Sequence, residues 1–445
     1  MKGDPEGVYP GKRGSILIDG VLTRKGRTDI FIDNRGIIGA VGEGVSRRYR
    51  NEADLLLPGK DCIAIPGLVN THTHAAMTLL RGYADDMPLE DWLSQKIWPL
   101  EANLTGQDVY WGTRLACLEM IRSGTIAFSD MYFFMDEAAR AVAESGLRAV
   151  LSYGFIDLFD ADRREREMKA TSDLVTGIRS LDNPKIRPAL GPHAVYTVSE
   201  ESLRWLADYS AREGIPVHIH LCETEKECAD AVRQWGKRPV QILDACGILT
   251  RNTIAAHCCW LDREECMLLG RRGVVVSHNP ASNMKLAVNR AMPYPWLKES
   301  GVSVTLGTDG SASNNNLDLF EEMKTAALLQ KFAWNSPTLL PAGEALAMAT
   351  EAGARALGTG NGTLAPGQPG DLVLIDRNAV CNTPMHNLDS NIVYSCSGAA
   401  VRTVICQGDI LMKDRFIPWE TEVIRGASAA AAGLVRRCSD SMHKH

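Results

Sequence analysis

The sequence predicts an α/β fold in which eight strands alternate with helices. Short β-rich segments recur along the middle of the chain, capped helical stretches separate them, and both ends of the chain contain only short strands and turns. Eight strands, each followed by a helix, fit either a closed (β/α)8 barrel or an open doubly wound sheet. No glycine-rich phosphate loop follows the first strand, which weakens the dinucleotide-binding form of the open sheet. The predicted strands lie at 62–74, 124–131, 148–153, 186–193, 215–223, 253–258, 273–278 and 302–309.

Capping residues mark helices between these strands. Thr105, with Asp108 three residues later, is typical of a capping box at the start of a helix that runs toward Ser123. Ser199 can cap a further helix, which Gly214 ends just before the next strand. These signals support alternation of helix and strand.

The two flanks predict a small β-sandwich. Residues 14–58 and 361–418 contain short alternating strands separated by turns, and half-sheets from opposite termini can pack face to face. An Ala-rich stretch at 427–432 indicates a terminal helix followed by a loose end. We therefore predict three segments, which are the N-terminal part of the sandwich (1–61), the barrel (62–360) and the C-terminal part of the sandwich with the tail (361–445).

Composition excludes several classes of protein. The chain has 445 residues, 48 Lys and Arg, 54 Asp and Glu, a formal net charge of −6 and 45% hydrophobic residues. Mixed, mildly acidic charge argues against nucleic-acid binding. No apolar run is long enough to cross a membrane, and residues 1–7 lack the apolar core of a secretory signal. The 12 cysteines form no CxxC pair. We therefore expect a reduced, cytoplasmic protein.

The strongest chemical signal is the pair of histidines at the end of the first strand. Alternate residues of a strand share a face, so His72 and His74 point to one side. Two imidazoles placed in this way can bind one divalent metal ion, although an HxH pair alone is weak evidence.

Other predicted strands also end in metal-binding residue types. His218 and His220 end the fifth strand, His257 the sixth, His278 the seventh and Asp309 the eighth. In a parallel barrel these strand ends open onto the same face, where active sites lie. A centre of three histidines and one aspartate with room for water would suit catalysis by a metal ion.

The sequence resembles the amidohydrolase superfamily, and most closely its 5-methylthioadenosine/S-adenosylhomocysteine deaminase branch. The resemblance spans nearly the whole chain and implies a (β/α)8 barrel with a β-sandwich made from both termini. It is carried by Pro66-Gly67-Leu68-Val69-Asn70-Thr71-His72-Thr73-His74, Trp98-Pro99-Leu100-Glu101, Gly191-Pro192-His193, His220-Leu221-Cys222-Glu223, Ser277-His278-Asn279-Pro280-Ala281-Ser282-Asn283 and Gly307-Thr308-Asp309-Gly310-Ser311-Ala312-Ser313-Asn314-Asn315.

The resemblance implies one divalent metal ion. Its ligands would be His72, His74, His220 and Asp309. Relatives with two metals use a bridging lysine or acid, commonly at the end of strand four, whereas here the nearest lysine, Lys185, lies at the beginning of that strand. Zn²⁺ is the expected ion, and Fe²⁺, Co²⁺ or Mn²⁺ can occupy such ligands.

The resemblance also implies catalytic roles. Glu223 matches the acid that protonates the ring nitrogen, His257 matches the residue that orients the hydroxide, and Asp309 passes a proton to the departing ammonia. Strict alternation would place positions 220 and 223 on opposite faces. The strand must therefore bend or end between them.

Substrate-binding positions follow in the same way. Glu101 matches the acid that binds the two ribose hydroxyls, and His193 matches a substrate-contacting position; Glu223 and Asp309 also face the substrate. The family uses an arginine ahead of strand four, for which Arg166 is our choice from the run at 163–166. Ser311 replaces an alanine common in relatives.

Three further predictions concern residues near these strand ends. His218 is expected to be a packed core residue, and His278 either touches substrate or braces its loop. Cys258 and Cys259, beside His257, are expected to be packing residues rather than nucleophiles.

The favoured hypothesis is a hydrolase that deaminates an adenosine derivative, such as 5′-methylthioadenosine or S-adenosylhomocysteine, to the inosine analogue and ammonia. One alternative is deamination or dechlorination of another nitrogen heterocycle, such as guanine or an s-triazine. A second is a non-catalytic binding or assembly protein, which would typically have lost metal ligands. The expected partner is a small nucleoside, without nucleic acid or membrane, and the expected assembly is a homo-oligomer.

Overall fold

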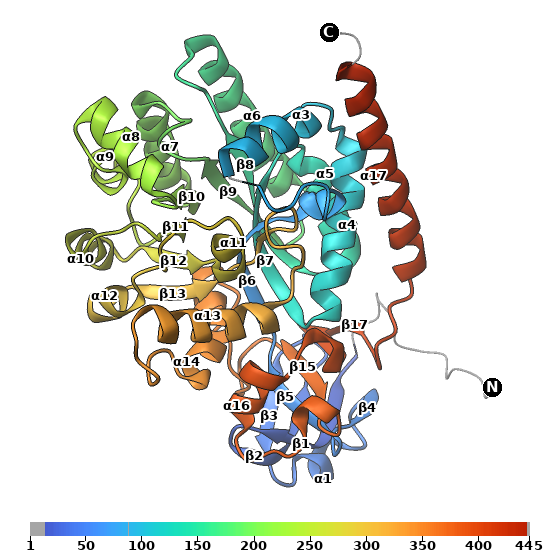
Figure 1. The fold of residues 1–445 in the computed structure, drawn as a ribbon. Coiled ribbons are helices and arrows are strands. Elements are labelled where there is room, and N and C mark those ends of the chain that lie inside the picture. Colours follow the sequence, from blue (N-terminus) through green and yellow to red (C-terminus); the bar gives the residue numbers. More distant parts are fainter. Residues whose placement is uncertain (1–13, 88, 443–445) are drawn as a thin grey trace.

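A helix-wrapped barrel and a smaller sheet make up the protein, seen here in a computed structural model that describes residues 14–87 and 89–442. The barrel occupies most of the molecule, the small sheet lies at one end of it, and a long C-terminal helix runs along its side (Figure 1). Residues 1–13, where the predicted first segment begins, and 443–445 lie outside the described residues.

Parallel strands form the barrel. β13 is followed after two residues by β14 (Asp309–Gly310), which pairs in parallel with β6. The sheet therefore returns to its first strand, and the amide of Thr308 donates to the carbonyl of His72 at 3.2 Å. The predicted barrel is confirmed. Its other strands, in sheet order, are β6 (Leu68–His74), β7 (Thr125–Tyr132), β8 (Arg148–Phe155), β9 (Ile186–Pro192), β10 (Val217–Leu221), β11 (Thr253–His257), β12 (Val275–His278) and β13 (Ser303–Leu306).

Helices cover the outside of the barrel, and the predicted caps are present. Thr105 and Asp108 form the capping box of α4, Ser199 caps α7, and Gly214 ends α7 in the left-handed region with φ 66°. These helices are α4 (Gly106–Arg122), α5 (Met135–Ser145), α6 (Ala161–Ser180), α7 (Glu200–Glu213), α8 (Glu225–Trp235), α9 (Pro239–Ala245), α10 (Arg263–Arg272), α11 (Pro280–Lys285), α12 (Tyr294–Glu299) and α13 (Leu319–Ala333).

Short helices make up the longer connections. Those between β6 and α4 are η1 (Ala75–Leu80), α2 (Leu89–Trp92), η2 (Leu93–Ile97) and α3 (Trp98–Glu101). Those after α13 are α14 (Ala342–Ala347), η3 (Met348–Ala352), α15 (Gly353–Ala356), η4 (Val380–Asn382), α16 (Leu388–Ser390), η5 (Asn391–Ser395) and η6 (Gly398–Ala400).

Both ends of the chain build the small β-rich part, as predicted, but their strands join in one mixed sheet through β5 and β15 and do not form two half-sheets packed face to face. Side chains alternate along β15: Leu372 and Leu374 enter the small core of this sheet, whereas Val373 and Ile375 join the large core of the barrel. The sheet thus joins its own core to that of the barrel. Its strands are β1 (Ile16–Thr23), β2 (Gly26–Ile32), β3 (Ile38–Gly42), β4 (Leu55–Pro58), β5 (Cys62–Pro66), β15 (Leu372–Asp376), β16 (Val401–Cys406) and β17 (Asp409–Met412), with α1 (Val45–Tyr49) after β3.

The prediction of a single strand over 62–74 is wrong, because two strands, β5 and β6, occupy this range. Its first part, β5, pairs antiparallel with β15 of the small sheet, whereas β6 pairs in parallel with β7 of the barrel. The chain changes sheet at Gly67, where a Cβ atom would lie 2.3 Å from Ile126 Cγ1. The division at 61/62 and 360/361 stays a prediction; β5 places residues 62–66 in the small sheet.

The prediction of a loose C-terminal end is also wrong for the residues up to 442. Helix α17 (Glu420–Met442) packs against α4 of the barrel, with Leu434 and Cys438 buried. Arg437 donates to the carboxylate of Asp108 and, at 3.2 Å, to the carbonyl of Asn103. The Ala-rich pattern indicated a helix but gave no information about the surface that this helix covers.

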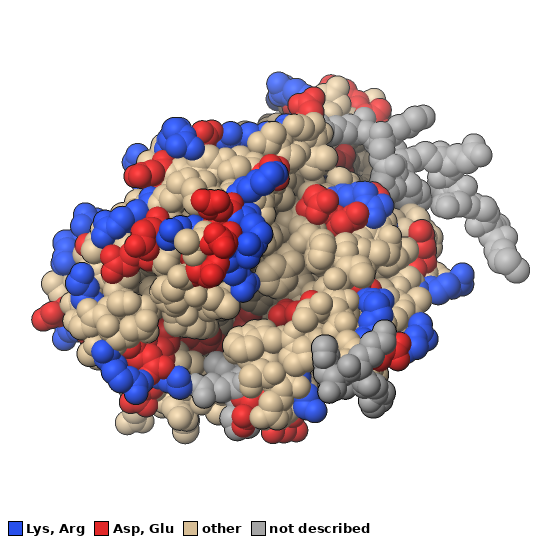
Figure 2. All heavy atoms as spheres, turned by 90° about the horizontal axis from the view of Figure 1, so that it is seen from above, with Lys and Arg blue, Asp and Glu red and all other residues tan. Residues whose placement is uncertain are grey.

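All 12 cysteines are free thiols. Within residues 14–87 and 89–442, no helix is both long and apolar enough to cross a membrane. Figure 2 shows that basic and acidic side chains are interspersed on the face seen from above, which is hollowed near its middle. The described part of this face carries no large patch of one charge sign.

Candidate metal centre and active site

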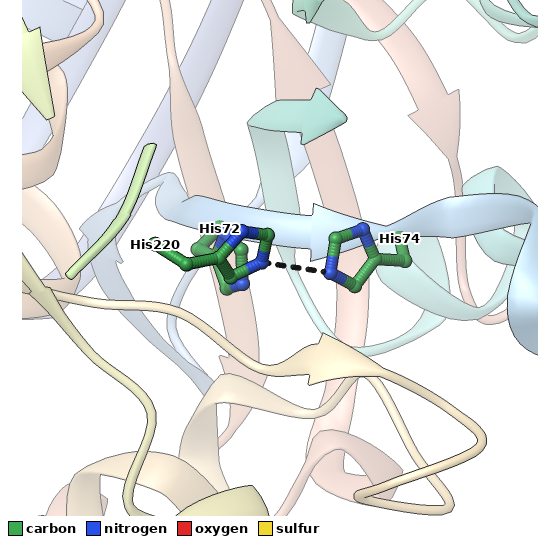
Figure 3. Close-up of side chains that lie close together, drawn as sticks. All are labelled: His72, His74 and His220. Carbon is green, nitrogen blue, oxygen red and sulfur yellow. Dashed lines mark hydrogen bonds between the residues drawn. The ribbon is translucent and has the colours of Figure 1, made fainter. Parts of the chain in front are cut away.

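The four predicted ligands converge at the carboxyl ends of the barrel strands. Asp309 Oδ1 lies 3.4 Å from His72 Nε2 and 3.3 Å from His74 Nε2. His220 Nε2 lies 3.2 Å from His74 Nε2, so three imidazole rings face one another (Figure 3). Residues far apart in the sequence thus bring possible ligand atoms together. The atoms of His72, His74 and His220 lie within 4.8 Å of one another, and so do those of His72, His257 and Asp309.

The hydrogen bonds of the imidazoles suit a cation. His74 Nδ1 lies 2.6 Å from the carbonyl of Met131, and His220 Nδ1 lies 2.8 Å from that of His193. A carbonyl only accepts, so each Nδ1 carries the proton and each Nε2 presents a lone pair to the centre. His72 Nε2 is buried without a hydrogen-bond partner. The donor set of nitrogen and carboxylate atoms therefore fits a divalent ion such as Zn²⁺.

His218 forms a hydrogen bond with the ring of His72. His72 Nδ1 lies 2.7 Å from His218 Nε2, and His218 Nδ1 lies 3.1 Å from Ser129 Oγ. If His72 binds a metal through Nε2, its Nδ1–H donates to His218, and His218 in turn donates to Ser129. Burial holds the pKa of His218 well below its usual value, which suits this neutral chain. His218 is buried as predicted, and it also contacts His72, a predicted ligand, which sequence analysis missed.

Asp309 is fixed from both carboxylate oxygens. Ser282 and Ser313 donate to Oδ2 at 2.6 and 3.1 Å, and the amide of Gly310 donates to Oδ1 at 2.9 Å. The backbone of Asp309 lies in the left-handed region with φ 61°, which costs free energy in a non-glycine residue and is typical of functional sites. Ser282 and Ser313 lie within the family motifs, but sequence analysis assigns them no role.

The strand bend required for Glu223 is present. β10 ends at Leu221, and Cys222 adopts φ 49°. The buried carboxylate of Glu227 accepts from the amides of Cys222 and Glu223 at 3.0 and 2.8 Å. The sequence offered no signal for this positioning role of Glu227.

The turned side chain of Glu223 lies beside His257. Glu223 Oε1 is 3.7 Å from His257 Nδ1. Burial, with a smaller contribution from the charge of Asp309, raises the pKa of Glu223 to about 8. A carboxyl group in this environment can hold a proton at neutral pH.

His257 is oriented by two asparagines. Asn283 Nδ2 lies 2.9 Å from His257 Nδ1, and Asn279 Nδ2 lies 3.3 Å from it. An amide nitrogen only donates, so His257 Nδ1 accepts and the ring proton is on Nε2. A ring nitrogen of His257 also lies within 4.8 Å of possible ligand atoms of His72 and Asp309. Its N–H can therefore donate a hydrogen bond close to the metal centre.

Two predicted substrate-binding side chains lie next to this centre. Tyr132 donates to Glu101 Oε1 at 2.6 Å, and the ring of Tyr132 lies 6.3 Å from that of His74. The ring of His193 lies 4.8 Å from that of His220, and its Nδ1 contacts Thr197 Oγ1 at 2.9 Å. The carboxylate of Glu101, at the end of α3, and the imidazole of His193, just after β9, thus lie near the predicted ligands from different elements.

The structure does not bring Arg166 to this cluster. Arg166 is exposed on α6, and Nε of its neighbour Arg163 lies 3.8 Å from Glu167 Oε1. His278 and Ser311 are fully buried, and their side-chain polar atoms have no hydrogen-bond partner among the described residues. The thiols of Cys258 and Cys259 are buried.

A histidine and aspartate metal centre at the carboxyl end of a (β/α)8 barrel, with a carboxylic acid beside it, is the arrangement of a metal-dependent hydrolase. The family model described as the amidohydrolase family matches residues 63–411. The chain therefore belongs to the amidohydrolase family.

Similar proteins extend over nearly the whole chain. A 5′-deoxyadenosine deaminase of Methanoregula boonei is 62% identical, over 96% of this chain and 97% of the relative. A 5-methylthioadenosine/S-adenosylhomocysteine deaminase 1 of Archaeoglobus fulgidus is 46% identical, over 91% and 94%. The crystal structure of an adenosine deaminase from Xanthomonas campestris with bound zinc has a TM-score of 0.89 and 35% identity, over 95% of this chain and 98% of that one.

Proposed function

We propose that the protein is a metal-dependent deaminase that converts a 5′-modified adenosine to the corresponding inosine analogue and ammonia. The observation that carries this proposal is the convergence of a complete set of candidate groups. Four metal ligands, the acid Glu223 and the imidazole His257 lie in one cluster at the carboxyl ends of the strands. A non-catalytic relative would have no need to keep all of them.

5′-Deoxyadenosine is the preferred substrate in this proposal. Its support is the name of the relative that is 62% identical, whereas the relative named for 5-methylthioadenosine and S-adenosylhomocysteine is 46% identical. All three nucleosides share the adenine ring and the two ribose hydroxyls and differ at the 5′ position. The same catalytic residues would therefore serve each of them.

The reaction replaces the C6–N6 bond of adenine with a C6–O bond, and water supplies the oxygen. A divalent ion held by His72, His74, His220 and Asp309 would lower the pKa of a water molecule to about 7. Glu223 gives a proton to ring nitrogen N1, where negative charge develops. The N–H of His257 orients the attacking oxygen. The carboxylate of Asp309 accepts one proton of the attacking water and passes it to the nitrogen that leaves as ammonia. As the C6–N6 bond breaks, the oxygen on C6 becomes a carbonyl, and its remaining proton returns to Glu223.

Glu101 and His193 bind the sugar side of the substrate. Two vicinal hydroxyls can donate to one carboxylate, and the Tyr132 hydroxyl already holds Glu101 Oε1 in place. A free purine base or an s-triazine has no ribose to use this carboxylate. These positions therefore favour a nucleoside substrate, and Arg166, which is exposed, is the least supported member of the binding set.

We also propose Zn²⁺ as the native ion and a cytoplasmic homo-oligomer as the working form. The histidine and aspartate ligands suit zinc, and the relative from Xanthomonas campestris was crystallised with bound zinc. Elemental analysis of protein purified without added metal and light scattering during size-exclusion chromatography test these two proposals.

A substrate panel tests the proposed function. Metal-loaded protein is mixed with 5′-deoxyadenosine, 5′-methylthioadenosine, S-adenosylhomocysteine, adenosine, guanine and an s-triazine, and the absorbance change and ammonia release are followed. We expect the largest kcat/KM with 5′-deoxyadenosine. Consumption of guanine or the triazine without turnover of any nucleoside would overturn the proposal.

A further inference from the structure

The opposite end of the barrel contains a cavity of about 110 Å³ at its junction with the small sheet. Three cations line it, namely Arg148, Lys185 and Arg187, whereas no carboxylate is among its lining residues. Thr359, on the connection from α15 to β15, and Gln407, in the turn between β16 and β17, complete its polar wall. The cavity lies at the amino ends of β8 and β9 and is separate from the candidate metal centre.

Two of the three cations have an acidic partner outside the cavity. Arg148 is buried, pairs with Asp371, and donates to the carbonyl of Thr359 at 2.6 Å. Lys185 Nζ lies 2.8 Å from Asp409 Oδ2. These pairs balance two of the three positive charges.

The third cation is not balanced. Arg187 forms no hydrogen bond or ion pair with a described residue, and burial together with the charge of Arg148 lowers its pKa. Its neighbour Gly358 leaves space for the guanidinium, since a Cβ there would lie 3.1 Å from Arg187 Nη1. The side chain of Arg187 reaches the exposed side of the cavity, which gives an ion a route in.

Arg148 also lines this cavity and has one donor without a partner in the described part of the chain. Arg148 Nε is buried and has no hydrogen-bond partner among the described residues. Native proteins rarely leave such a group unpaired without a bound water or ion. Two arginines that line one cavity, one of them without an acidic partner among the described residues, are a suitable recognition site for an oxyanion.

We propose that this cavity binds a tetrahedral oxyanion of the phosphate or sulfate class between Arg148, Lys185 and Arg187. The ion would supply the missing negative charge and accept from the Arg187 guanidinium. Since the lining comes from the barrel and from connections to the small sheet, occupancy would stabilise their junction.

Equilibrium dialysis against radiolabelled phosphate, at an ionic strength held constant with sodium chloride, tests the proposal directly. We expect about one phosphate per chain for the native protein, at least tenfold weaker binding for R187Q, and unchanged binding for R271Q, which removes an exposed arginine of α10. Sulfate should compete with phosphate and chloride should not. Phosphate held at the metal centre would instead persist in R187Q and disappear after chelation.

Thermal unfolding gives a second readout. Phosphate should raise the Tm of the native protein by about 1–3 °C in a saturable way and leave the Tm of R187Q unchanged. R187Q should keep the native deamination rate, because Arg187 lies outside the catalytic cluster. Equal phosphate binding by native protein and R187Q would show that the ion binds without Arg187, and no binding by either would show that the cavity takes no oxyanion; either result would overturn the proposal.

Discussion

The two ends of the barrel are built in opposite ways. At the carboxyl ends, His257 and Asp309 have left-handed backbones, and their side chains face other ionisable groups. At the amino ends, Arg148 is paired with Asp371 and Lys185 with Asp409. Unpaired lone pairs thus gather where chemistry is proposed, whereas ion pairs link the barrel to the small sheet. Substitutions at the first end should change catalysis, and those at the second should change stability.

Glu223→Gln should have the largest effect on rate. The amide cannot donate a proton as the acid does, so kcat should fall by about 10²–10⁴-fold. Metal content should stay the same, because Glu223 is not a proposed ligand. Glu225→Gln, an exposed neighbour at the start of α8, is the matched control and should react at the native rate. Near-normal turnover by Glu223→Gln would assign the proton to another group.

Asp371→Asn should have the largest effect on stability. It leaves the buried guanidinium of Arg148 without its charge partner, which should cost about 3–5 kcal/mol of unfolding free energy. Urea denaturation measures this loss, and kcat of the remaining folded protein should stay within about twofold, because the pair is remote from the proposed chemistry. A large loss of kcat with native stability would contradict the division between the two ends.

His218→Leu should weaken metal binding by about 10–100-fold, because it removes the acceptor that orients His72. Competition with a chelator of known affinity measures the effect independently of activity. His218→Gln keeps an acceptor and should recover part of the affinity. His386→Gln, an exposed histidine of the C-terminal flank, is the control and should bind metal as the native protein does. Native affinity in His218→Leu would mean that this histidine only fills space.

Gly67→Ala should have the smallest effect. Its methyl group would meet Ile126 Cγ1 at 2.3 Å, so the strands must shift, at a cost of about 1–3 kcal/mol. Gly177→Ala on α6 is a matched control, because nothing lies within 4 Å of its added Cβ. That control should stabilise the protein by about 0.5–1 kcal/mol. Thermal unfolding compares the two, and equal effects would show that the change of sheet tolerates a side chain.

Much of the site could be predicted because it depends on strand ends. Two-residue alternation placed His72 and His74 on one side, and the barrel topology brought His220 and Asp309 to them. Helix caps such as Thr105 could also be predicted, since a capping box is formed within four consecutive residues.

Features that depend on distant contacts could not be predicted. The chain changes sheet at Gly67 because β15 pairs with the strand before it and Ile126 leaves no room for a side chain; both contacts are distant in the sequence. Glu227 bends the chain toward the site through two backbone amides, and the sequence shows it only as a helical glutamate. Arg166 was chosen by position in a charged run, where nothing distinguishes a binding arginine from an exposed one.

The central claim is that the histidine and aspartate cluster performs hydrolytic deamination of a nucleoside. Its most direct test is ammonia release from 5′-deoxyadenosine by one preparation measured as purified, after removal of metal by a chelator, and after Zn²⁺ is restored. We predict one ammonia per nucleoside consumed, loss of activity in proportion to the metal removed, and recovery on restoration. Unchanged ammonia release from metal-free protein would contradict the claim.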